Sequence, residues 1–252
     1  MLNAHRREHI LERISNHRKV SVADVASTLD VSDETVRRDL KSLEREGLLR
    51  RVHGGAISVT PIRDEPINLR AQKLAQEKAL IAQLAVKLIS DGTSVFLNIG
   101  STVEALARQL GHFNDLKLYT NSLNVARIAN EFKGVTVFVT PGQLRSVETD
   151  LVGYDTISYI QNYYFDTVFM GVAGVDIERG FMDYEEDEAR IRQALIKSAR
   201  NKVMLADSSK FGRSANICSA SFSVIDRLVT DVQPDKAYQK CFRASGMEVI
   251  HG

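Results

Sequence analysis

The chain has 252 residues, of which 44% are hydrophobic and 26% are charged, and its formal net charge is +1. This length suits a small domain followed by a medium-sized one, each large enough to bury its own core. The balanced charge excludes a chain that is basic throughout, so only local clusters of cations can indicate a nucleic-acid partner. The sequence therefore predicts two domains whose partners must be inferred from local patterns.

Cys218 and Cys241 are far apart and show no metal-ligand spacing, which is typical of reduced thiols in a cytoplasmic protein. No apolar signal segment stands at the N-terminus. No uninterrupted apolar run reaches about 18 residues, the length that a membrane-spanning helix needs. We therefore expect a soluble, cytoplasmic protein with no metal, no cofactor and no membrane partner.

Three short helices are expected near the N-terminus. Apolar residues at helical spacing over 10–14 indicate the first helix, and Ser21–Leu29 forms the second. The third begins after its N-cap, Ser32, and continues to Arg45. Only two residues separate the second helix from the N-cap of the third, which is typical of a helix-turn-helix.

The third helix has an apolar stripe formed by Val36, Leu40 and Leu43. An isolated Arg-Arg pair on such a helix more often belongs to an ordinary solvent-exposed face. Because another short amphipathic helix directly precedes this one, we nevertheless interpret it as a recognition helix. Beside the stripe lie cationic and hydroxyl side chains that suit phosphate oxygens and base edges: Thr35, Arg37, Arg38, Lys41 and Ser42.

Gly47 ends the helical pattern, and residues 48–56 alternate and then turn at paired glycines, as a short hairpin does. This hairpin completes a winged helix-turn-helix DNA-binding domain over residues 1–57. Its basic side chains would lie beside a phosphate backbone. The predicted DNA-binding residues are Ser32, Thr35, Arg37, Arg38, Lys41, Arg50, Arg51 and His53.

The periodicity then lapses, and we expect a linker over residues 58–72, which contain Pro61 and Pro66. The second domain is expected over residues 73–252. It begins with a long helix that has one apolar face from Leu74 to Ile89. This helix can pack within its own domain or form a dimer seam, and we favour the first arrangement.

From Thr93 onward, short apolar runs alternate with helical patterns, which predicts an α/β domain with a mostly parallel sheet. Small and polar residues follow the strands, at the edge where an open α/β sheet binds its ligand. The expected strands are Ser94–Ile99, Leu116–Thr120, Val135–Val139, Thr167–Val172, Val203–Ala206, Arg227–Thr230 and Met247–Ile250.

Gly100-Ser-Thr102 lies between a strand and a helix expected over Val103–Leu110. Backbone N–H groups, two hydroxyls and a glycine at this place suit a phosphate group, although Ser-Thr before a helix is more often only an N-cap. Lys210 and Arg145 follow other strands. Each alone is typical of a solvated charge, but together they predict a phosphate clamp.

An acidic run, Asp183–Glu188, could supply carboxylates for acid–base chemistry at a sugar site. We favour a negatively charged helix start in which Glu188 and Arg192 form an i,i+4 pair, and we retain Glu188 as a candidate hydroxyl ligand. Only His112 and His251 lie in the second domain, and neither belongs to a motif. No catalytic constellation is therefore predicted.

The recognition helix Val-Ser-x-x-Thr-Val-Arg-Arg-Asp-Leu over residues 31–40 and the wing Arg-x-His-Gly-Gly-Ala over residues 51–56 resemble those of the DeoR family of bacterial transcriptional regulators. The resemblance covers nearly the whole chain. In the second domain the matching motifs are Gly100-Ser-Thr102, Thr120-Asn-Ser122 and Asp207-x-x-Lys210-Phe-Gly212. The departures are Pro141-Gly142 in place of Gly-Gly, Asn98 in place of Asp, and Arg192 in place of Lys.

The resemblance implies that residues 73–252 form an effector-binding and oligomerisation domain with the fold of the sugar-phosphate isomerases. It implies a homo-oligomeric repressor of a carbohydrate operon, which a phosphorylated sugar releases from double-stranded operator DNA. The alternative is a sugar-phosphate isomerase or deaminase with an accessory DNA-binding domain, which turnover of candidate sugar phosphates would reveal. The expected effector-binding residues are Asn98, Gly100, Ser101, Thr102, Thr120, Asn121, Ser122, Arg145, Glu188, Asp207 and Lys210.

Overall fold

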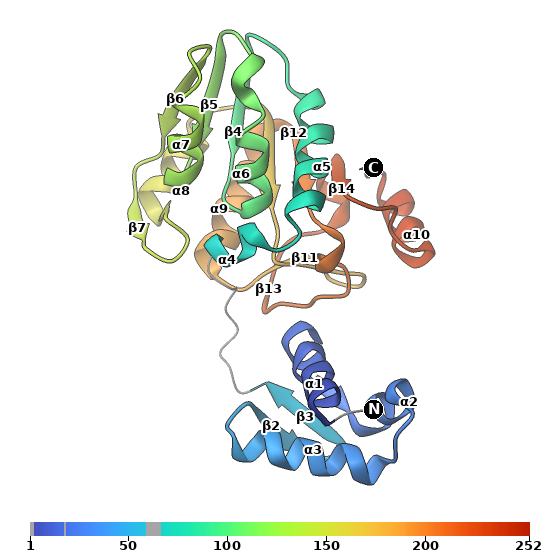
Figure 1. The fold of residues 1–252 in the computed structure, drawn as a ribbon. Helices are drawn as coiled ribbons and strands as arrows, with labels where there is room; N and C mark the ends of the chain where they lie inside the picture. Colours follow the sequence, from blue (N-terminus) through green and yellow to red (C-terminus); the bar gives the residue numbers. More distant parts are fainter. Residues whose placement is uncertain (1–2, 18, 59–66) are drawn as a thin grey trace. The chain divides into compact units, whose positions relative to one another are not determined.

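The computed structural model describes residues 3–17, 19–58 and 67–252. The chain divides into two compact units, Met1–Arg63 and Asp64–Gly252. Figure 1 shows the helices and strands of each unit. The two units are considered separately below, because each has its own sheet and its own apolar core.

The N-terminal unit combines helices with one antiparallel sheet, in which the strand order is β1-β3-β2. The predicted helix-turn-helix and hairpin are confirmed, and the pairing of β1 with β3 is an addition to the prediction. The described elements are α1 (Asn3–His17), β1 (Lys19–Ser21), α2 (Val22–Leu29), α3 (Asp33–Arg45), β2 (Leu49–Val52) and β3 (Gly55–Ser58).

The helix-turn-helix follows from two local caps and a shared apolar core. The hydroxyls of Ser21 and Ser32 each accept a hydrogen bond from a backbone N–H in the first turn of α2 and α3, respectively. Asp30, with φ of 49°, ends α2 in the left-handed conformation, which Asp adopts more readily than most residues. The inner face of α3 packs into the core through Val36, Leu40 and Leu43.

Asp39 adds a polar contact between α3 and α1. Its buried carboxylate accepts hydrogen bonds from Nε and Nη2 of Arg6, the second at 3.1 Å. A two-pronged arginine–carboxylate pair fixes geometry and compensates the two charges for their loss of water. The recognition helix is therefore held by an ion pair as well as by apolar packing.

The wing depends on a close approach of two strands and on one contact with α3. A Cβ atom on Gly55 would lie 1.9 Å from the carbonyl oxygen of Val20, so only glycine allows β3 to pair with β1 here. The backbone N–H of Arg51 donates to Oε1 of Glu44 at 2.8 Å. This bond ties β2 to α3, so that the wing stays next to the recognition helix.

The C-terminal unit is built around a seven-stranded sheet in which all paired neighbours are parallel. All seven expected strands are present with small shifts at their ends, which confirms the predicted α/β architecture. In the sheet order β15-β14-β12-β9-β4-β5-β6, the strands are β15 (Glu248–His251), β14 (Arg227–Thr230), β12 (Ala199–Leu205), β9 (Phe165–Gly171), β4 (Ser94–Leu97), β5 (Leu116–Thr120) and β6 (Val135–Val139).

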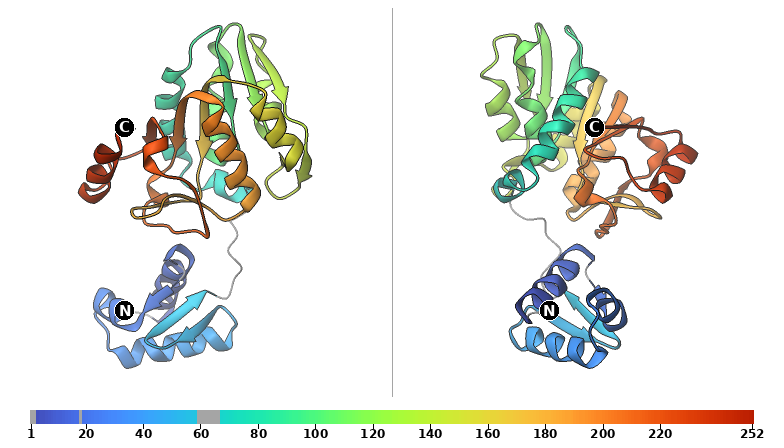
Figure 2. Two further views of the ribbon diagram at one scale, coloured as in Figure 1. Left: turned by 180° about the vertical axis from the view of Figure 1, so that it is seen from behind. Right: turned by 45° about the vertical axis from the view of Figure 1, so that its right-hand side comes forward.

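Helices cover both faces of this sheet (Figures 1 and 2). Alternate residues of β4 show the two faces, because Val95 and Leu97 join one apolar cluster and Phe96 joins the other. Burial on both faces explains the almost continuous apolar strands. The first cluster includes residues of α5 (Ala75–Ala85), α6 (Ser101–Ala107) and α7 (Leu123–Ala129), and the second includes residues of α8 (Tyr154–Gln161), α9 (Glu186–Lys197) and α10 (Lys236–Ser245).

Two smaller sheets were not expected from the sequence. β7 (Gln143–Arg145) and β8 (Asp150–Val152) form an antiparallel hairpin. β10 (Gly174–Asp176), β11 (Gly180–Asp183) and β13 (Ile217–Ala220) form a three-stranded antiparallel sheet. Strands of three or four residues are too short to produce a periodic signal in the sequence.

The start of the C-terminal unit also differs from the expectation. Helix α4 (Ile67–Gln72) lies within the interval expected to be a linker, whereas Pro61 and Pro66 lie outside the described residues. The following helix begins only at Ala75, because Leu74 adopts the left-handed conformation with φ of 53°. α5 then passes into the 3-10 turn η1 (Val86–Leu88). Among the described residues, no helix has both the length and the apolar composition of a membrane span.

We predict that Asp39→Ala weakens the N-terminal unit by about 1.5–3 kcal/mol, the usual contribution of hydrogen bonds to a charged group. Hydrogen exchange of the amides of α1 and α3, measured in the full chain, should report this loss. Glu34→Ala is the matched control, because Glu34 forms an exposed i,i+4 pair with Arg38 at 3.5 Å and should change stability by less than about 0.5 kcal/mol. Equal effects of the two substitutions would contradict a structural role for Asp39.

Candidate functional site

The outer face of α3 carries the cations that the sequence indicated. Arg37, Arg38 and Lys41 are exposed, opposite the buried residues of the same helix. Arg38 lies 3.5 Å from Glu34, one turn earlier. Neither of these exposed charges is held by burial, so both side chains can reorient toward an anionic partner.

The wing and α3 share one surface. Arg37 of α3 lines a shallow surface depression together with Arg51, Val52, His53 and Gly54 of the wing. Arg51 also lies 3.3 Å from Oε2 of Glu44, so its guanidinium is positioned by α3. Arg50 is exposed on the same short strand.

Ser32 and Thr35 have a local role at the start of α3. Their hydroxyls lie 2.9 Å apart, and the hydroxyl of Ser32 accepts the backbone N–H of Thr35 at 3.3 Å. This is the expected N-cap. Both residues remain predictions as DNA contacts.

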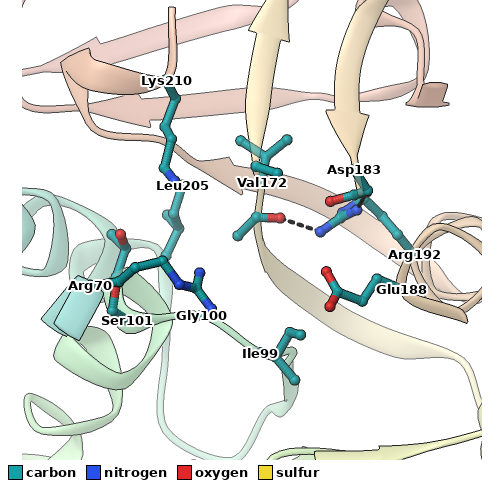
Figure 3. A pocket seen from close by; sticks show the side chains of 13 residues that line it. Arg70, Ile99, Gly100, Ser101, Val172, Asp183, Glu188, Arg192, Leu205 and Lys210 are labelled. Atoms are coloured by element: carbon teal, nitrogen blue, oxygen red, sulfur yellow. Dashed lines mark hydrogen bonds and ion pairs between the residues drawn. The ribbon is translucent and has the colours of Figure 1, made fainter. Parts of the chain in front are cut away.

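The C-terminal unit contains a pocket at the carboxyl edge of its parallel sheet (Figure 3). The loops that form it follow β4, β9 and β12, which is where an open α/β sheet binds ligands. The lining residues are Arg70, Ile99, Gly100, Ser101, Thr102, Gly171, Val172, Ala173, Asp183, Glu188, Arg192, Leu205 and Lys210.

Five of the sequence-predicted effector residues line this pocket: Gly100, Ser101, Thr102, Glu188 and Lys210. Ser101 and Thr102 are buried at the start of α6, and no side chain caps that helix. Sequence reasoning missed Arg70, Asp183 and Arg192. Arg70 lay in the interval expected to be a linker. Asp183 was assigned to a negatively charged helix start, and Arg192 was assigned to an i,i+4 pair with Glu188.

The remaining six predicted residues do not line the pocket: Asn98, Thr120, Asn121, Ser122, Arg145 and Asp207. Those after β5 serve the local backbone. The hydroxyl of Thr120 accepts the N–H of Ser122 at 2.9 Å, Ser122 caps α7, and the side-chain amide of Asn121 donates to the carbonyl of Leu151 at 3.2 Å. Asp207 caps the turn η3 (Ser208–Lys210), and Asn98 is buried beside the pocket loop.

Arg145 binds carboxylates and is not positioned as the expected phosphate clamp. Its guanidinium donates to both oxygens of Asp150, at 3.0 and 2.9 Å, and to Oε1 of Glu188 at 2.8 Å. Burial acts to lower the pKa of Arg145, but its bonds and charge interactions with these two carboxylates outweigh it, and the pKa is raised. The physical role of Arg145 in this structure is to orient Glu188.

Glu188 lines the pocket, and the pKa of its carboxyl is raised. Its side chain is only 16% exposed, and burial raises its pKa to about 7 although Arg145 opposes that shift. The negative charges of Glu148 and Asp150 raise it further. Near neutral pH the Glu188 carboxyl can therefore donate or accept a hydrogen bond.

The expected i,i+4 pair of Glu188 with Arg192 is wrong. Arg192 pairs with Asp183 inside the pocket wall, and it donates to the hydroxyl of Ser219 at 3.2 Å and to the carbonyl of Gly171. Complete burial lowers the pKa of Arg192, and Asp183 is the carboxylate that pairs with it. Apart from this ion pair, the Asp183 oxygens and Nε of Arg192 have no hydrogen-bond partner among the described residues.

A winged helix-turn-helix with an exposed cationic face, followed by an α/β unit with a polar pocket at its sheet edge, defines the class of ligand-responsive DNA-binding regulators. Two family models match the chain: a DeoR-like helix-turn-helix domain over residues 6–61 and a DeoR C terminal sensor domain over residues 73–232. The chain belongs to the DeoR family of transcriptional regulators.

Named relatives span nearly the full length. The chain is 31% identical to the glycerol-3-phosphate regulon repressor of Escherichia coli K12, over 93% of each chain. It is 34% identical to the HTH-type transcriptional regulator GlpR of Haloferax volcanii, over 100% of this chain and 99% of that one. It is 31% identical to the HTH-type transcriptional repressor GlcR of Bacillus subtilis 168, over 96% of this chain and 93% of that one.

Similarity to solved structures is lower. A D-ribose-5-phosphate isomerase in complex with phospho-erythronic acid has a TM-score of 0.42 and 17% identity, covering 56% of this chain and 55% of that chain. The membership of the family rests on the sequence relatives and the family models.

Glu188 should make stability depend on pH. The pKa of Glu188 is about 7 in the folded state and lies above the ordinary 4.5. Protonation of Glu188 therefore contributes fully to the free energy of unfolding below about pH 4.5, and this contribution is lost as the pH rises through 7. Between pH 5 and 8 the wild type should lose roughly 2.5 kcal/mol relative to Glu188→Gln.

Urea unfolding followed by tyrosine fluorescence measures this difference, because all seven tyrosines lie at or after position 119 and report only the C-terminal unit. Glu186→Gln, an exposed change on the same helix, is the matched control. A difference between wild type and Glu188→Gln that stayed constant with pH would show that Glu188 does not titrate in this range.

Proposed function

We propose that the chain is a repressor of an operon for a sugar or carbohydrate derivative, and that it is not an enzyme. A phosphorylated sugar binds in the pocket and releases the protein from its operator. The observation that carries the proposal is a pocket with cations and hydroxyls on one side and carboxylates on the other, in the same chain as a cationic recognition surface. The names of the relatives, among them a glycerol-3-phosphate regulon repressor, support it.

The phosphate group is assigned to the side of the pocket formed by Arg70, Ser101 and Lys210 (Figure 3), together with Thr102, which follows Ser101 in α6. Charge-assisted hydrogen bonds from a guanidinium and an ammonium, with two hydroxyls beside them, suit a phosphate dianion. Because these groups lie at a buried sheet edge, the anion exchanges its hydration for fixed protein donors. This side therefore supplies most of the affinity.

The sugar hydroxyls are assigned to the opposite side, where Figure 3 shows Asp183, Glu188 and Arg192 together. Carboxylate oxygens accept hydrogen bonds from hydroxyls, and the incompletely bonded Asp183–Arg192 pair has acceptor and donor capacity left. A ligand that leaves buried polar groups without partners binds poorly. This side therefore supplies most of the selectivity among phosphorylated sugars.

DNA binding is assigned to α3 and the wing, with Arg37, Arg38 and Lys41 as the main contacts. One winged helix reads too few base pairs for useful selectivity, and paired half-sites are the usual remedy. The active species is therefore a homo-oligomer. Its assembly is assigned to the C-terminal unit, which has the larger apolar core.

One observation favours a second function, sugar-phosphate isomerisation. A carboxyl with a pKa of about 7 suits general acid–base catalysis, and Glu188 has that property in the pocket. Against it, no His or Cys lines the pocket among the described residues, and Glu188 is already held by Arg145. Phosphorus NMR of candidate sugar phosphates incubated with the protein separates the two functions, since only an enzyme converts them.

Arg37→Ala and Arg38→Ala should each weaken binding to a DNA duplex that the wild type selects from a random pool. A phosphate contact should reduce the slope of log affinity against log salt by about one, and a base contact should cost roughly 1–3 kcal/mol at one position. Fluorescence anisotropy over a range of salt concentrations measures both. Arg190→Ala, on the exposed side of α9, is the control. If both α3 variants bound like Arg190→Ala, the recognition helix would be misassigned.

Lys210→Ala and Ser101→Ala should leave duplex binding intact without ligand and abolish its response to the phosphorylated sugar. A thermal-shift screen of phosphorylated sugars against their unphosphorylated counterparts identifies the ligand, which raises the melting temperature by mass action. The variants are then titrated with it. Unchanged midpoints in both variants, or equal shifts with the unphosphorylated sugar, would rule out this phosphate site.

A further inference from the structure

Arg70 comes from α4, which precedes every other pocket-lining residue in the chain. Its side chain is 14% exposed and extends toward the loop of Gly100 and Ser101 (Figure 3). In the sequence, α4 is the first described helix after the segment that joins the two units. A change in the contacts of Arg70 therefore acts on the described helix of the C-terminal unit that is nearest in sequence to the DNA-binding unit.

Arg70 is held by the carboxylate of Glu148. Nη2 of Arg70 donates to Oε2 of Glu148, which is buried in the turn of the β7–β8 hairpin. Besides burial, Glu148 and Asp150 are causes of the raised pKa of Glu188, so the three carboxylates lie close together. Arg70 therefore links this carboxylate cluster to the cationic side of the pocket.

Lys78 attaches the end of α4 to the same region. Its buried ammonium donates to the carbonyl of Arg70 at 2.7 Å and to that of Lys73, and it lies 4.0 Å from Oδ2 of Asp207. Burial is the main cause that lowers the pKa of Lys78, and the positive charges of Lys210 and Arg70 lower it further although Asp207 opposes them. Two other cations thus repel the Lys78 ammonium, and an anion bound beside them relieves that repulsion.

The junction between α4 and α5 is a strained point of the backbone. Leu74 has φ of 53°, a left-handed conformation that is unfavourable for a residue with a Cβ atom. Strained residues of this kind are concentrated at switch regions and persist only where their surroundings hold them. α4 has six residues and ends two residues before Leu74.

We propose that Arg70 is shared between Glu148 and the bound phosphate monoester, and that binding draws α4 away from the β7–β8 hairpin toward Ser101. The proposal rests on the proposed function, because it requires the phosphate group beside Ser101 and Lys210. A ligand shifts an equilibrium only through contacts that differ between two arrangements. In this structure Nη2 of Arg70 donates to Glu148, and a phosphate beside Ser101 and Lys210 competes for the same donor, so transfer of this hydrogen bond is such a difference and displaces α4.

Hydrogen exchange of the full chain with and without saturating inorganic phosphate tests the proposal. In the wild type, phosphate should slow exchange in the loop at residues 98–104 and change it in α4. In Arg70→Gln, the loop should still be protected at saturation, because Ser101 and Lys210 remain, but the change in α4 should be lost.

Phosphate affinity measured by titration calorimetry gives a second test. Glu148→Gln should bind phosphate roughly three- to tenfold more tightly, because Arg70 no longer has to leave an ion pair. The double variant Arg70→Gln/Glu148→Gln should bind like Arg70→Gln alone. Glu186→Gln, which removes an exposed carboxylate, should bind like the wild type.

The outcomes distinguish the two proposals. No protection of residues 98–104 in the wild type would overturn the phosphate site itself, and the role of Arg70 with it. A protected loop with an unchanged α4, or the same α4 response in Arg70→Gln, would overturn only the role of Arg70. Tighter binding by Glu148→Gln that persisted in the double variant would also overturn it, because the gain would not pass through Arg70.

Discussion

Arginine–carboxylate pairs between different helices and strands hold both functional surfaces in place. Asp39 of α3 meets Arg6 of α1, and the buried Arg192 of α9 meets Asp183 of β11. A charge removed from water is tolerated only when it is paired and hydrogen-bonded, so each pair determines where two segments must meet. The recognition helix and the pocket wall therefore depend on contacts that are more specific in geometry than apolar packing alone.

Features that arise from local periodicity could be predicted from the sequence. The seven parallel strands follow from apolar runs buried on both faces, and the helix-turn-helix from two serine caps and one apolar stripe on α3. α4 and the short strands β7 and β8 could not, because three to six residues give no readable period. The pairing of Arg70 with Glu148 spans 78 positions, and no local rule connects residues so far apart.

The spacing of charged residues in the sequence also indicated the wrong ion-pair partner where two were available. Glu188 and Arg192 have the spacing of a helical ion pair, yet each bonds a residue from another segment, Arg145 or Asp183. Helical i,i+4 pairs contribute little, so a buried partner prevails. The polar residues after β5 likewise bond backbone groups of the surrounding loops. Buried backbone N–H and carbonyl groups need hydrogen-bond partners, and these side chains supply them.

The distribution of charge around the pocket restricts what can fill it. Cations on the side of Arg70 and Lys210 are best satisfied by an anion, whereas the carboxylates of Asp183 and Glu188 are best satisfied by hydrogen-bond donors. Inorganic phosphate meets the first requirement only, and a neutral sugar meets the second only. A molecule that joins a phosphate to hydroxyl groups meets both. We therefore propose that the selectivity of the pocket lies in the connection between its two sides and in the distance that separates them.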